Sequence, residues 1–458
     1  MNNINFKYKN YAHFDSKKSY KTCLKYIKNK DCICKHGFYP FIHFQMRMKK
    51  HEFDHENNTV HRKDDKVRDI YYSAHMDRYI YEYYGAKLNY LYDKMAEKLG
   101  INEVAIAYRD NLKGKCNIHF AKEVIDFISN QKEAYIYIAD FTSFFENLDH
   151  IFLKEKLCNV YGEDRLTDDQ YAVFKSITNY VYINKEDILK ELKMGKNKFK
   201  KQDIIFKKPK EFREFKKKGY LHKHKDESPD KGIPQGSAIS SVYANVYMID
   251  CDKEINDYVK LYNGIYRRYC DDIIIIIPKD DTNINFNEFL EKITKIFQKT
   301  KNLNIKKEKT NTYIYTNKCI FNYEEYNLYG NENIKPKVMN YLGFSFDGKI
   351  VKIRDRSLSK FYKKMYRKIN IANFYTDKYG RNVFRKRLYK YYSHLGNVRY
   401  VDMILKDGER KKVRFRGGFL RYADKAHKIF SESDNYISYI DNQIKRHWIK
   451  IYKGLNKI

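Results

Sequence analysis

The sequence predicts a mixed α+β fold that combines long helices with buried strands. Ile273 to Ile277 form an uninterrupted β-branched run, typical of a strand that is buried on both faces. Residues 134–139 form a second strand-like run, which ends on Asp140. Apolar side chains recur at helical spacing over 75–100, which predicts a long helix ahead of both strands.

The remaining segments follow the same two periodicities. Shorter helices are expected at 121–128 and 153–160. A longer helix over 237–258 begins with small side chains, which let another backbone or a nucleotide come close. The later segments are expected to be a helix, a hairpin and a largely helical end of the chain, at 286–300, 311–328 and 357–458.

The charge of the chain indicates a polyanionic partner. Lys and Arg number 91 against 58 Asp and Glu, a formal net charge of +33, and nucleic acid is the first candidate for such a partner. Residues 193–225 are especially rich in lysine. Two hypotheses remain for this segment: a solvated, flexible insertion, or a patch that follows the backbone of RNA or DNA.

The sequence has no apolar run of 18 residues, so no membrane span is expected. The first residues lack an apolar signal segment, and we therefore expect a cytoplasmic protein. Its eight cysteines are expected to be reduced thiols. Cys23, Cys32, Cys34 and His36 offer zinc-ligand types at an unusual spacing, so buried thiols are the expectation and zinc the alternative.

Carboxylates stand at the ends of both predicted strands. Asp271 and Asp272 precede the isoleucine run, and Asp140 ends the other strand. Adjacent carboxylates repel each other and are poorly solvated beside a buried strand, so we expect a divalent cation there. If both strands deliver carboxylates to one edge, they form a two-metal site for phosphoryl or nucleotidyl transfer. The hypothesis requires that no carboxylate is buried in a bond to lysine or arginine.

Four segments that carry polar, glycine and aromatic residues follow one another along the chain. They are Asp140–Phe145, Gly232–Ser237, Tyr269–Asp272 and Tyr341–Phe344. In this order they resemble the palm motifs of reverse transcriptases, and the resemblance covers roughly residues 60–355. It implies a right-hand polymerase whose palm combines an antiparallel sheet with helices. The implied divisions are an N-terminal extension at 1–60, fingers at 61–130, a palm at 131–350 with a basic insertion at about 190–230, and an α-helical thumb at 351–458.

The resemblance also implies which residues carry the chemistry. Two Mg²⁺ ions are expected at Asp140, Phe141, Asp271 and Asp272, and the three aspartates are the implied catalytic residues. Lys309 falls where the family places a lysine that protonates pyrophosphate. The alternative for Lys309 is an ordinary surface lysine.

Other residues match positions that bind the substrates. Phe145 matches the steric gate that disfavours a 2′-hydroxyl group. Arg68 resembles the fingers arginine that grips the triphosphate, with a surface arginine as the alternative. The turn that lies along template and incoming nucleotide, and the primer grip, correspond to Pro234, Gln235 and Gly236 and to Tyr341, Leu342 and Gly343.

Several local strings are similar to one branch of the family, the bacterial "unknown group" and abortive-infection reverse transcriptases that act in defence against phage. These strings lie at 72–78, 107–109, 120–122, 346–354, 419–423 and 443–447. The resemblance implies DNA synthesis from deoxynucleoside triphosphates (dNTPs) with a non-coding RNA as template. A partner protein or a homo-oligomer stays open.

Three other activities remain as alternatives. A template-independent or protein-primed terminal transferase could use the same palm. An RNA-binding scaffold with a dead polymerase site is disfavoured by the three aspartates. An RNA polymerase is disfavoured by Phe145.

Overall fold

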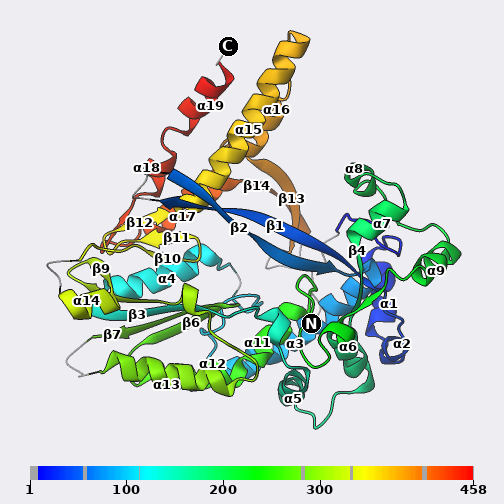
Figure 1. Ribbon diagram of the computed structural model, residues 1–458, viewed down its shortest axis with the longest axis horizontal. Coiled ribbons are helices and arrows are strands. Elements are labelled where there is room, and N and C mark those ends of the chain that lie inside the picture. Colours follow the sequence, from blue (N-terminus) through cyan, green and yellow to red (C-terminus); the bar gives the residue numbers. More distant parts are fainter. Residues whose placement is uncertain are drawn as a thin grey trace. The chain divides into compact units, whose positions relative to one another are not determined.

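The computed structural model describes residues 9–54, 59–112, 114–279, 284–330, 334–404 and 410–456 (Figure 1). The chain divides into two compact units, and each unit is assembled from separate stretches of sequence. The first unit comprises Met1–Lys113, Ile138–Ile275 and Asn285–Thr310. The second comprises Gly114–Tyr137, Ile276–Ile284 and Asn311–Ile458. No helix among the described residues is both long and apolar enough to cross a membrane.

The first unit is mainly helical. Its described helices are α1 (Tyr20–Lys28), α2 (Lys30–Cys34), α3 (His75–Lys98), α5 (His150–Tyr161), α6 (Asp168–Thr178), α7 (Lys185–Glu191), α8 (Lys196–Phe199), α9 (Pro209–Lys217), α10 (His224–Glu227), α11 (Ser240–Tyr247), α12 (Ile249–Lys260) and α13 (Phe286–Lys299). Helix α3 confirms the prediction for 75–100. The carboxylate of Asp15 caps its first turn by accepting hydrogen bonds from the main-chain N–H groups of His75 and Met76. The long helix predicted over 237–258 is instead two helices, α11 and α12, which meet at Met248.

A four-stranded sheet of the first unit has the order β2-β1-β4-β5. Its strands are β1 (Phe41–Asp54), β2 (Thr59–Tyr72), β4 (Val181–Asn184) and β5 (His222–Lys223). The long strands β1 and β2 pair antiparallel, whereas β1 and β4 pair parallel. Apolar and polar residues alternate only briefly, over Phe44–Lys49, within the charged sequence of β1 and β2, and the sequence analysis did not predict this hairpin.

The sheet that carries the aspartates has the order β6-β7-β3-β8-β9. Its strands are β6 (Ile265–Tyr269), β7 (Asp272–Pro278), β3 (Glu133–Asp140), β8 (Asn311–Thr316) and β9 (Cys319–Asn322). Ile273 to Ile277 are 0–1% exposed, which confirms the prediction of a strand buried on both faces. Hydrogen bonds from Lys279 N to Glu133 O (2.9 Å) and from Phe141 N to Asp271 O (3.4 Å) show that β3 and β7 run antiparallel. The end of β3 and the start of β7 therefore share one edge of the sheet.

The second unit combines helices with two small sheets. Its described helices are α4 (Asn117–Ser129), α14 (Tyr323–Tyr329), α15 (Asp355–Tyr379), α16 (Arg385–Tyr392), α17 (Phe419–Phe430), α18 (Ile440–Ile444) and α19 (His447–Leu455). Strands β10 (Met339–Tyr341), β11 (Phe344–Phe346), β12 (Ile350–Ile353) and β15 (Ile437–Ser438) form one sheet in that order. Strands β13 (Asn397–Ile404) and β14 (Arg410–Gly417) form a hairpin. This hairpin lies in the part of the chain that the sequence analysis expected to be helical.

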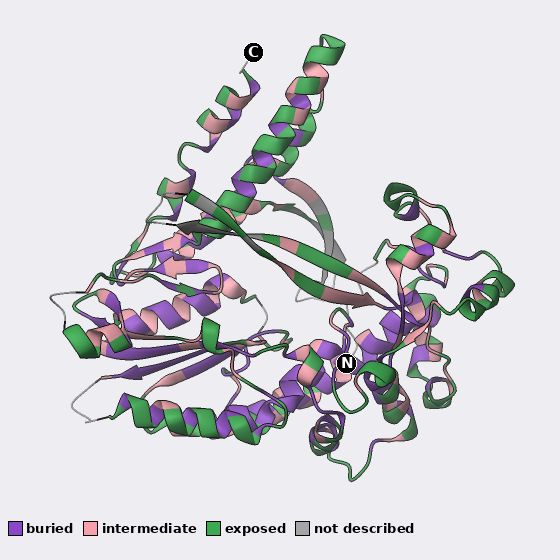
Figure 2. Ribbon diagram, viewed as in Figure 1, coloured by how far each residue is buried: buried purple, intermediate pink, exposed green. Residues whose placement is uncertain are grey.

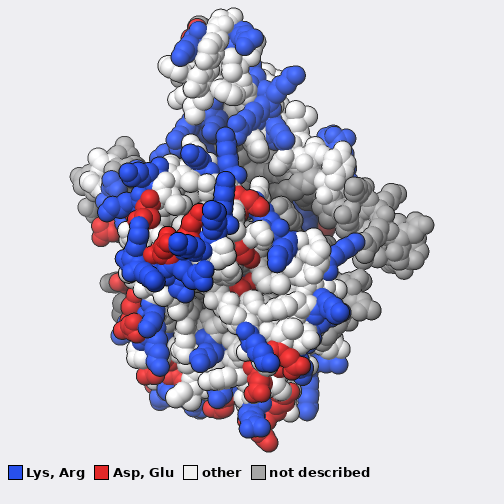
Figure 3. Space-filling view, turned by 90° about the vertical axis from the view of Figure 1, so that its right-hand side faces the viewer, with Lys and Arg blue, Asp and Glu red and all other residues white. Residues whose placement is uncertain are grey.

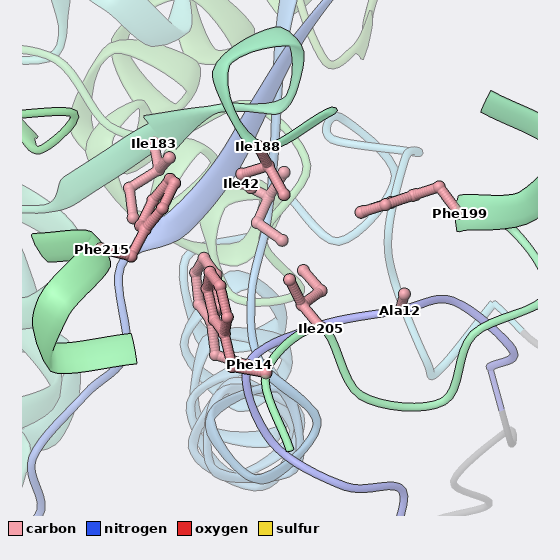
Figure 4. Packing of buried hydrophobic residues seen from close by; sticks show 9 residues of the cluster. Ala12, Phe14, Ile42, Ile183, Ile188, Phe199, Ile205 and Phe215 are labelled. Atoms are coloured by element: carbon pink, nitrogen blue, oxygen red, sulfur yellow. The ribbon is translucent and has the colours of Figure 1, made fainter. Parts of the chain in front are cut away.

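The lysine-rich segment 193–225 is folded onto a hydrophobic cluster of the first unit. Phe199, Ile205 and Phe215 are buried, and they pack with Phe14 and Ile42 (Figure 4). The lysines of α8 and α9 stay exposed on the other side of these short helices, as the mixed colouring of the helices in Figure 2 illustrates. The segment is therefore folded onto the first unit rather than being a loose insertion, because its aromatic residues pack against Ile42 of β1 and against Phe14. Its lysines are solvated, as one of the two hypotheses expected.

We expect Phe215→Ala to loosen this segment without unfolding the chain. Truncating a buried phenylalanine costs about 3–5 kcal/mol, so the main chain of 193–225 should unfold locally more often and trypsin should cleave it faster after its lysines. The measurement is the rate of limited proteolysis within this segment, which follows the population of the open state. Lys217→Ala, an exposed position on the same helix α9, is the control. Equal cleavage rates in both variants would contradict the packing.

Candidate active site

The three aspartates lie at the edge that β3 and β7 share. Asp140 ends β3 and is only 7% exposed, whereas Asp271 is half-buried and Asp272 is exposed at the start of β7. The turn between β6 and β7 is tight, because Cys270 adopts a left-handed conformation with φ +61°. The hydrogen bond from Phe141 N to Asp271 O joins the main chains of the two acidic segments.

The carboxylate of Asp140 is partly satisfied by a lysine. Its Oδ2 forms an ion pair with Nζ of Lys309, whose side chain is 42% exposed. Its Oδ1 is buried and has no hydrogen-bond partner among the described residues. The main chain brings Lys309 there, because Lys306 N donates to Asp140 O (2.8 Å) and Lys309 N donates to Lys306 O (3.0 Å). The structure thus brings Lys309 to Asp140, whereas its role at the pyrophosphate stays a prediction.

The metal hypothesis required that no carboxylate be buried in a bond to lysine or arginine, and this ion pair does not meet that condition. It corrects the expectation that the three carboxylates stand free for metal. The side chain of Lys309 is nonetheless 42% exposed, and the second carboxylate oxygen of Asp140 still lacks a partner. A buried carboxylate oxygen without a partner is costly, and a cation would satisfy it. The pair therefore fits a replaceable counter-charge better than a permanent bond.

The residues present fit a divalent cation in chemistry but do not form a complete cage. Among the described residues no group of three or more His, Cys, Asp or Glu side chains is placed to hold a metal. The convergence of Asp140, Asp271 and Asp272 on two ions therefore stays a prediction. The only oxygen that Phe141 offers to a metal is its main-chain carbonyl. Its ring is buried and stacks on the ring of Phe144, with 5.3 Å between the ring centroids.

Phe145 lies beside the loop that the resemblance assigns to the nucleotide. Ile233 N donates to Phe145 O (2.9 Å), and Gly232 N donates to Leu148 O (2.9 Å). The Phe145 ring is half-buried, whereas the neighbouring Phe144 is a buried core residue. The structure thus brings the candidate gate and the candidate nucleotide loop together.

Strand β2 holds the same loop from another side. Tyr71 N donates to Gln235 O (2.9 Å), and Ser240 Oγ donates to Pro234 O (2.8 Å). Gly236 has φ +122°, and a Cβ atom there would clash with the carbonyl oxygen of Tyr71. Only glycine therefore fits this close approach. Arg68 is an exposed residue of β2, three positions before Tyr71.

Tyr108 lies near the acidic turn, although the sequence analysis cited it only within the string 107–109 and gave it no role at the site. Its side chain is 53% exposed, and its φ is +61°. Partial burial, followed by the nearby Cys270, Tyr269 and Asp271, raises the pKa of the Tyr108 hydroxyl to about 12, while Arg68 acts in the opposite direction. Tyr108 therefore stands between the catalytic turn and β2. Its sequence neighbourhood has no periodicity that could have revealed this position.

The candidate primer grip belongs to the second unit. Leu342 and Gly343 form the turn between β10 and β11, with φ +44° and +93°. Asn117, the first residue of α4, donates from Nδ2 to Leu342 O (3.0 Å) and to the Tyr422 hydroxyl (2.8 Å). Tyr341 is buried at the end of β10. The turn is thus fixed by a polar side chain that is distant in sequence.

The group of zinc-type residues near the N-terminus has other partners. Nδ1 of His36 contacts the Tyr26 hydroxyl at 2.9 Å, and its Nε2 contacts Asp77 Oδ1 at 2.8 Å. Both ring nitrogens are therefore engaged. Cys23 is buried and Cys34 is exposed, and all eight cysteines are free thiols. The expectation of buried thiols therefore holds for Cys23 and is wrong for Cys34, and the ring nitrogens of His36 already have partners.

Comparisons with known proteins can now be set beside this geometry. The sequence profile of the family described as reverse transcriptase (RNA-dependent DNA polymerase) matches residues 93–346. No curated protein matches the chain. Among solved structures, apo telomerase from Candida tropicalis truncated from its C-terminal domain shares 12% identity at a TM-score of 0.39, over 71% of this chain and 56% of that chain. Telomerase from Candida albicans, solved with a TWJ fragment of telomeric RNA, shares 11% identity at a TM-score of 0.38, over 96% and 66%.

The chain spans less than two thirds of the length of either telomerase, and such low TM-scores carry no argument about function. The family profile is the stronger result. The matched residues include the three aspartates, the gate, the nucleotide loop and the candidate primer grip. Because this match covers more than half of the 458 residues, the chain belongs to the reverse transcriptase family of RNA-dependent DNA polymerases.

Proposed function

We propose that the chain is an RNA-directed DNA polymerase that adds dNTPs to a growing strand by two-metal nucleotidyl transfer. One observation carries the proposal beyond family membership. Asp140 is buried at the end of β3 with an unpartnered oxygen, and the adjacent main chain is bonded to that of Asp271. The shared edge of the sheet thus presents negative charge where a cationic centre is needed.

The side chains at this edge have complementary roles in the proposed reaction. Bound Mg²⁺ would supply activation of the 3′-hydroxyl and neutralisation of the triphosphate. Asp140 and Asp271 would hold the ions, and Asp272 would add negative charge nearby. Lys309, already beside Asp140, donates a proton to the departing pyrophosphate. Phe145 excludes the 2′-hydroxyl of a ribonucleotide, and Gly236 allows the backbone to approach the incoming nucleotide.

The proposal extends to the biological setting. The local strings quoted above support a role in anti-phage defence, with a non-coding RNA as template and a cytoplasmic location. In this proposal, 61–130 form the fingers, 131–350 the palm and 351–458 the thumb. Template-independent or protein-primed synthesis remains the second candidate, because the same acidic edge would serve it.

Asp271→Asn combined with Asp272→Asn should abolish incorporation of labelled dNTPs on an RNA template. Metal centres contribute several kcal/mol to such transfers, so we expect a loss of at least about a thousand-fold. RNA binding, measured by filter retention, should persist. The control is Asp257→Asn, an exposed carboxylate on α12 away from the turn. Continued extension by the double variant would refute the assignment, and equal extension without template would favour the terminal transferase.

Phe145→Ala should increase the use of ribonucleotides. Removing the ring removes the clash with a 2′-hydroxyl group, so the ratio of kcat/KM for dNTPs to that for ribonucleotides should fall roughly ten-fold or more. Steady-state incorporation of each nucleotide class measures this ratio. Phe145→Tyr keeps the bulk of the ring and should keep the selectivity. An unchanged ratio in Phe145→Ala would remove the gate from the mechanism.

The exposed face of α9 is the surface that we propose for binding the RNA backbone. Lysine and arginine side chains gather over the face drawn in Figure 3. Replacing Lys210, Arg213 and Lys217 with glutamine should weaken RNA binding and reduce the slope of log K against log salt by about 2–3. Titrations at several salt concentrations measure this. Lys292, Lys295 and Lys299 on α13 are exposed controls, and an equal effect of both triple variants would show that only the net charge matters.

A further inference from the structure

Arg268 is completely buried, although it is charged and lies only three residues before Asp271. Its exposed fraction is 0%, and it is the largest fully buried side chain among the described residues. Burying a guanidinium group is costly unless the protein supplies a countercharge and hydrogen bonds. The burial of this charged residue on β6, next to the turn that carries two aspartates, therefore needs a physical explanation.

The countercharge comes from α12. Nε and Nη2 of Arg268 donate to Oδ1 and Oδ2 of Asp252 at 2.8 and 2.5 Å, a bidentate pair that fixes the plane of the guanidinium group. Asp252 is also 0% exposed. The hydroxyl of Tyr266 donates to Asp252 Oδ1 at 2.9 Å, which fixes the carboxylate in turn. The pair is therefore held rigidly between a helix and a strand.

The remaining end of the guanidinium group reaches the catalytic turn. Nη1 of Arg268 donates to Cys270 O at 3.0 Å and to Oδ1 of Asn245 on α11 at 3.3 Å. Cys270 has a positive φ, a conformation that a residue with a side chain rarely adopts without support. Its carbonyl belongs to the peptide bond that leads into Asp271, so this contact sets the direction in which Asp271 leaves the turn.

The same arrangement holds the segment before Tyr108. Nδ2 of Asn245 donates to Ala107 O at 3.0 Å. Arg268 N donates to Val104 O at 2.8 Å, and Ile106 N donates to Arg268 O at 3.0 Å. One buried arginine thus connects α11, α12, the catalytic turn and the segment that carries Tyr108.

We propose that Arg268, Asp252 and Asn245 are positioning residues that fix the Cys270–Asp271 peptide for nucleotidyl transfer. They act through Asp271 and touch neither substrate nor metal. The inference rests on the proposed polymerase function. Stability alone does not account for the pair, because well-packed apolar residues commonly replace a buried ion pair without loss of stability. What apolar side chains cannot replace is the donor to the carbonyl of Cys270.

The decisive variant is the double replacement Arg268→Met with Asp252→Leu. It removes both charges together, so the core stays free of an unpaired ion. We expect a folded protein with a somewhat lower melting temperature, because the Tyr266 hydroxyl and the Cys270 carbonyl lose their partners. The kcat for dNTP incorporation should fall by ten- to about a hundred-fold with a KM for dNTP within two-fold of wild type, since small misplacements of reacting groups have effects of this size. The Mg²⁺ concentration for half-maximal rate should rise several-fold, because Mg²⁺ demands near-ideal geometry.

Arg268→Lys is the second variant. It keeps a positive charge near Asp252 but loses the fork that reaches Cys270 O, so kcat should again fall while binding of dNTP persists. Arg267→Lys is the matched control, because the neighbouring arginine of the same strand pairs with the exposed Glu103 at 3.0 Å and donates to Tyr266 O. Its kcat and Mg²⁺ dependence should match wild type.

The outcomes separate the inference from the proposed function. If wild type and Arg267→Lys polymerise and the folded Arg268 variants are slow with a raised Mg²⁺ requirement, the positioning role is supported. If the folded Arg268 variants match the control in kcat and Mg²⁺ dependence, the positioning role is overturned and the polymerase proposal survives. If wild type itself incorporates no dNTP on RNA, the proposed function fails and the inference fails with it.

Discussion

Buried charge at the edge of one sheet is the constraint on which the rest of the structure depends. Strand β3 carries a carboxylate into the interior, and Lys309 balances only one of its oxygens. Three residues before the second acid, Arg268 is balanced completely by Asp252. Asp140 and Arg268 thus differ in how far their charges are balanced. A satisfied pair gives rigidity, whereas a partly satisfied carboxylate keeps an affinity for cations.

The parts around this edge are linked by hydrogen bonds that main-chain carbonyl groups accept. The nucleotide loop is bonded to β2 through Tyr71, to the gate segment through Ile233 and to α11 through Ser240. Glycine at 236 is required by the first of these contacts. A substrate site held by such hydrogen bonds is rigid, which suits a reaction in which the reacting atoms must be closely aligned.

Sequence reasoning reached the parts of this fold that local patterns determine. Ile273 to Ile277 had no polar face, so their burial followed directly, and the aspartates beside them could be placed at a strand edge. The hairpin of β1 and β2 was missed because its apolar alternation is confined to Phe44–Lys49 and the rest of both strands is rich in charged residues. The packing of Phe215 and the pairing of Arg268 with Asp252 were missed for another reason. Both depend on partners far away in the sequence, which periodicity does not reveal.

The division of the chain into two units has a consequence for biosynthesis. Each unit is discontinuous, and the chain crosses from one to the other within β3 and again within β7. The first unit contains Asn285–Thr310, so a ribosome must release more than two thirds of the protein before that unit can close. The two units therefore cannot fold one after the other during synthesis. Strand β3 must wait, with its apolar surface exposed, for partners that are translated much later, and chaperones have their greatest opportunity in that interval.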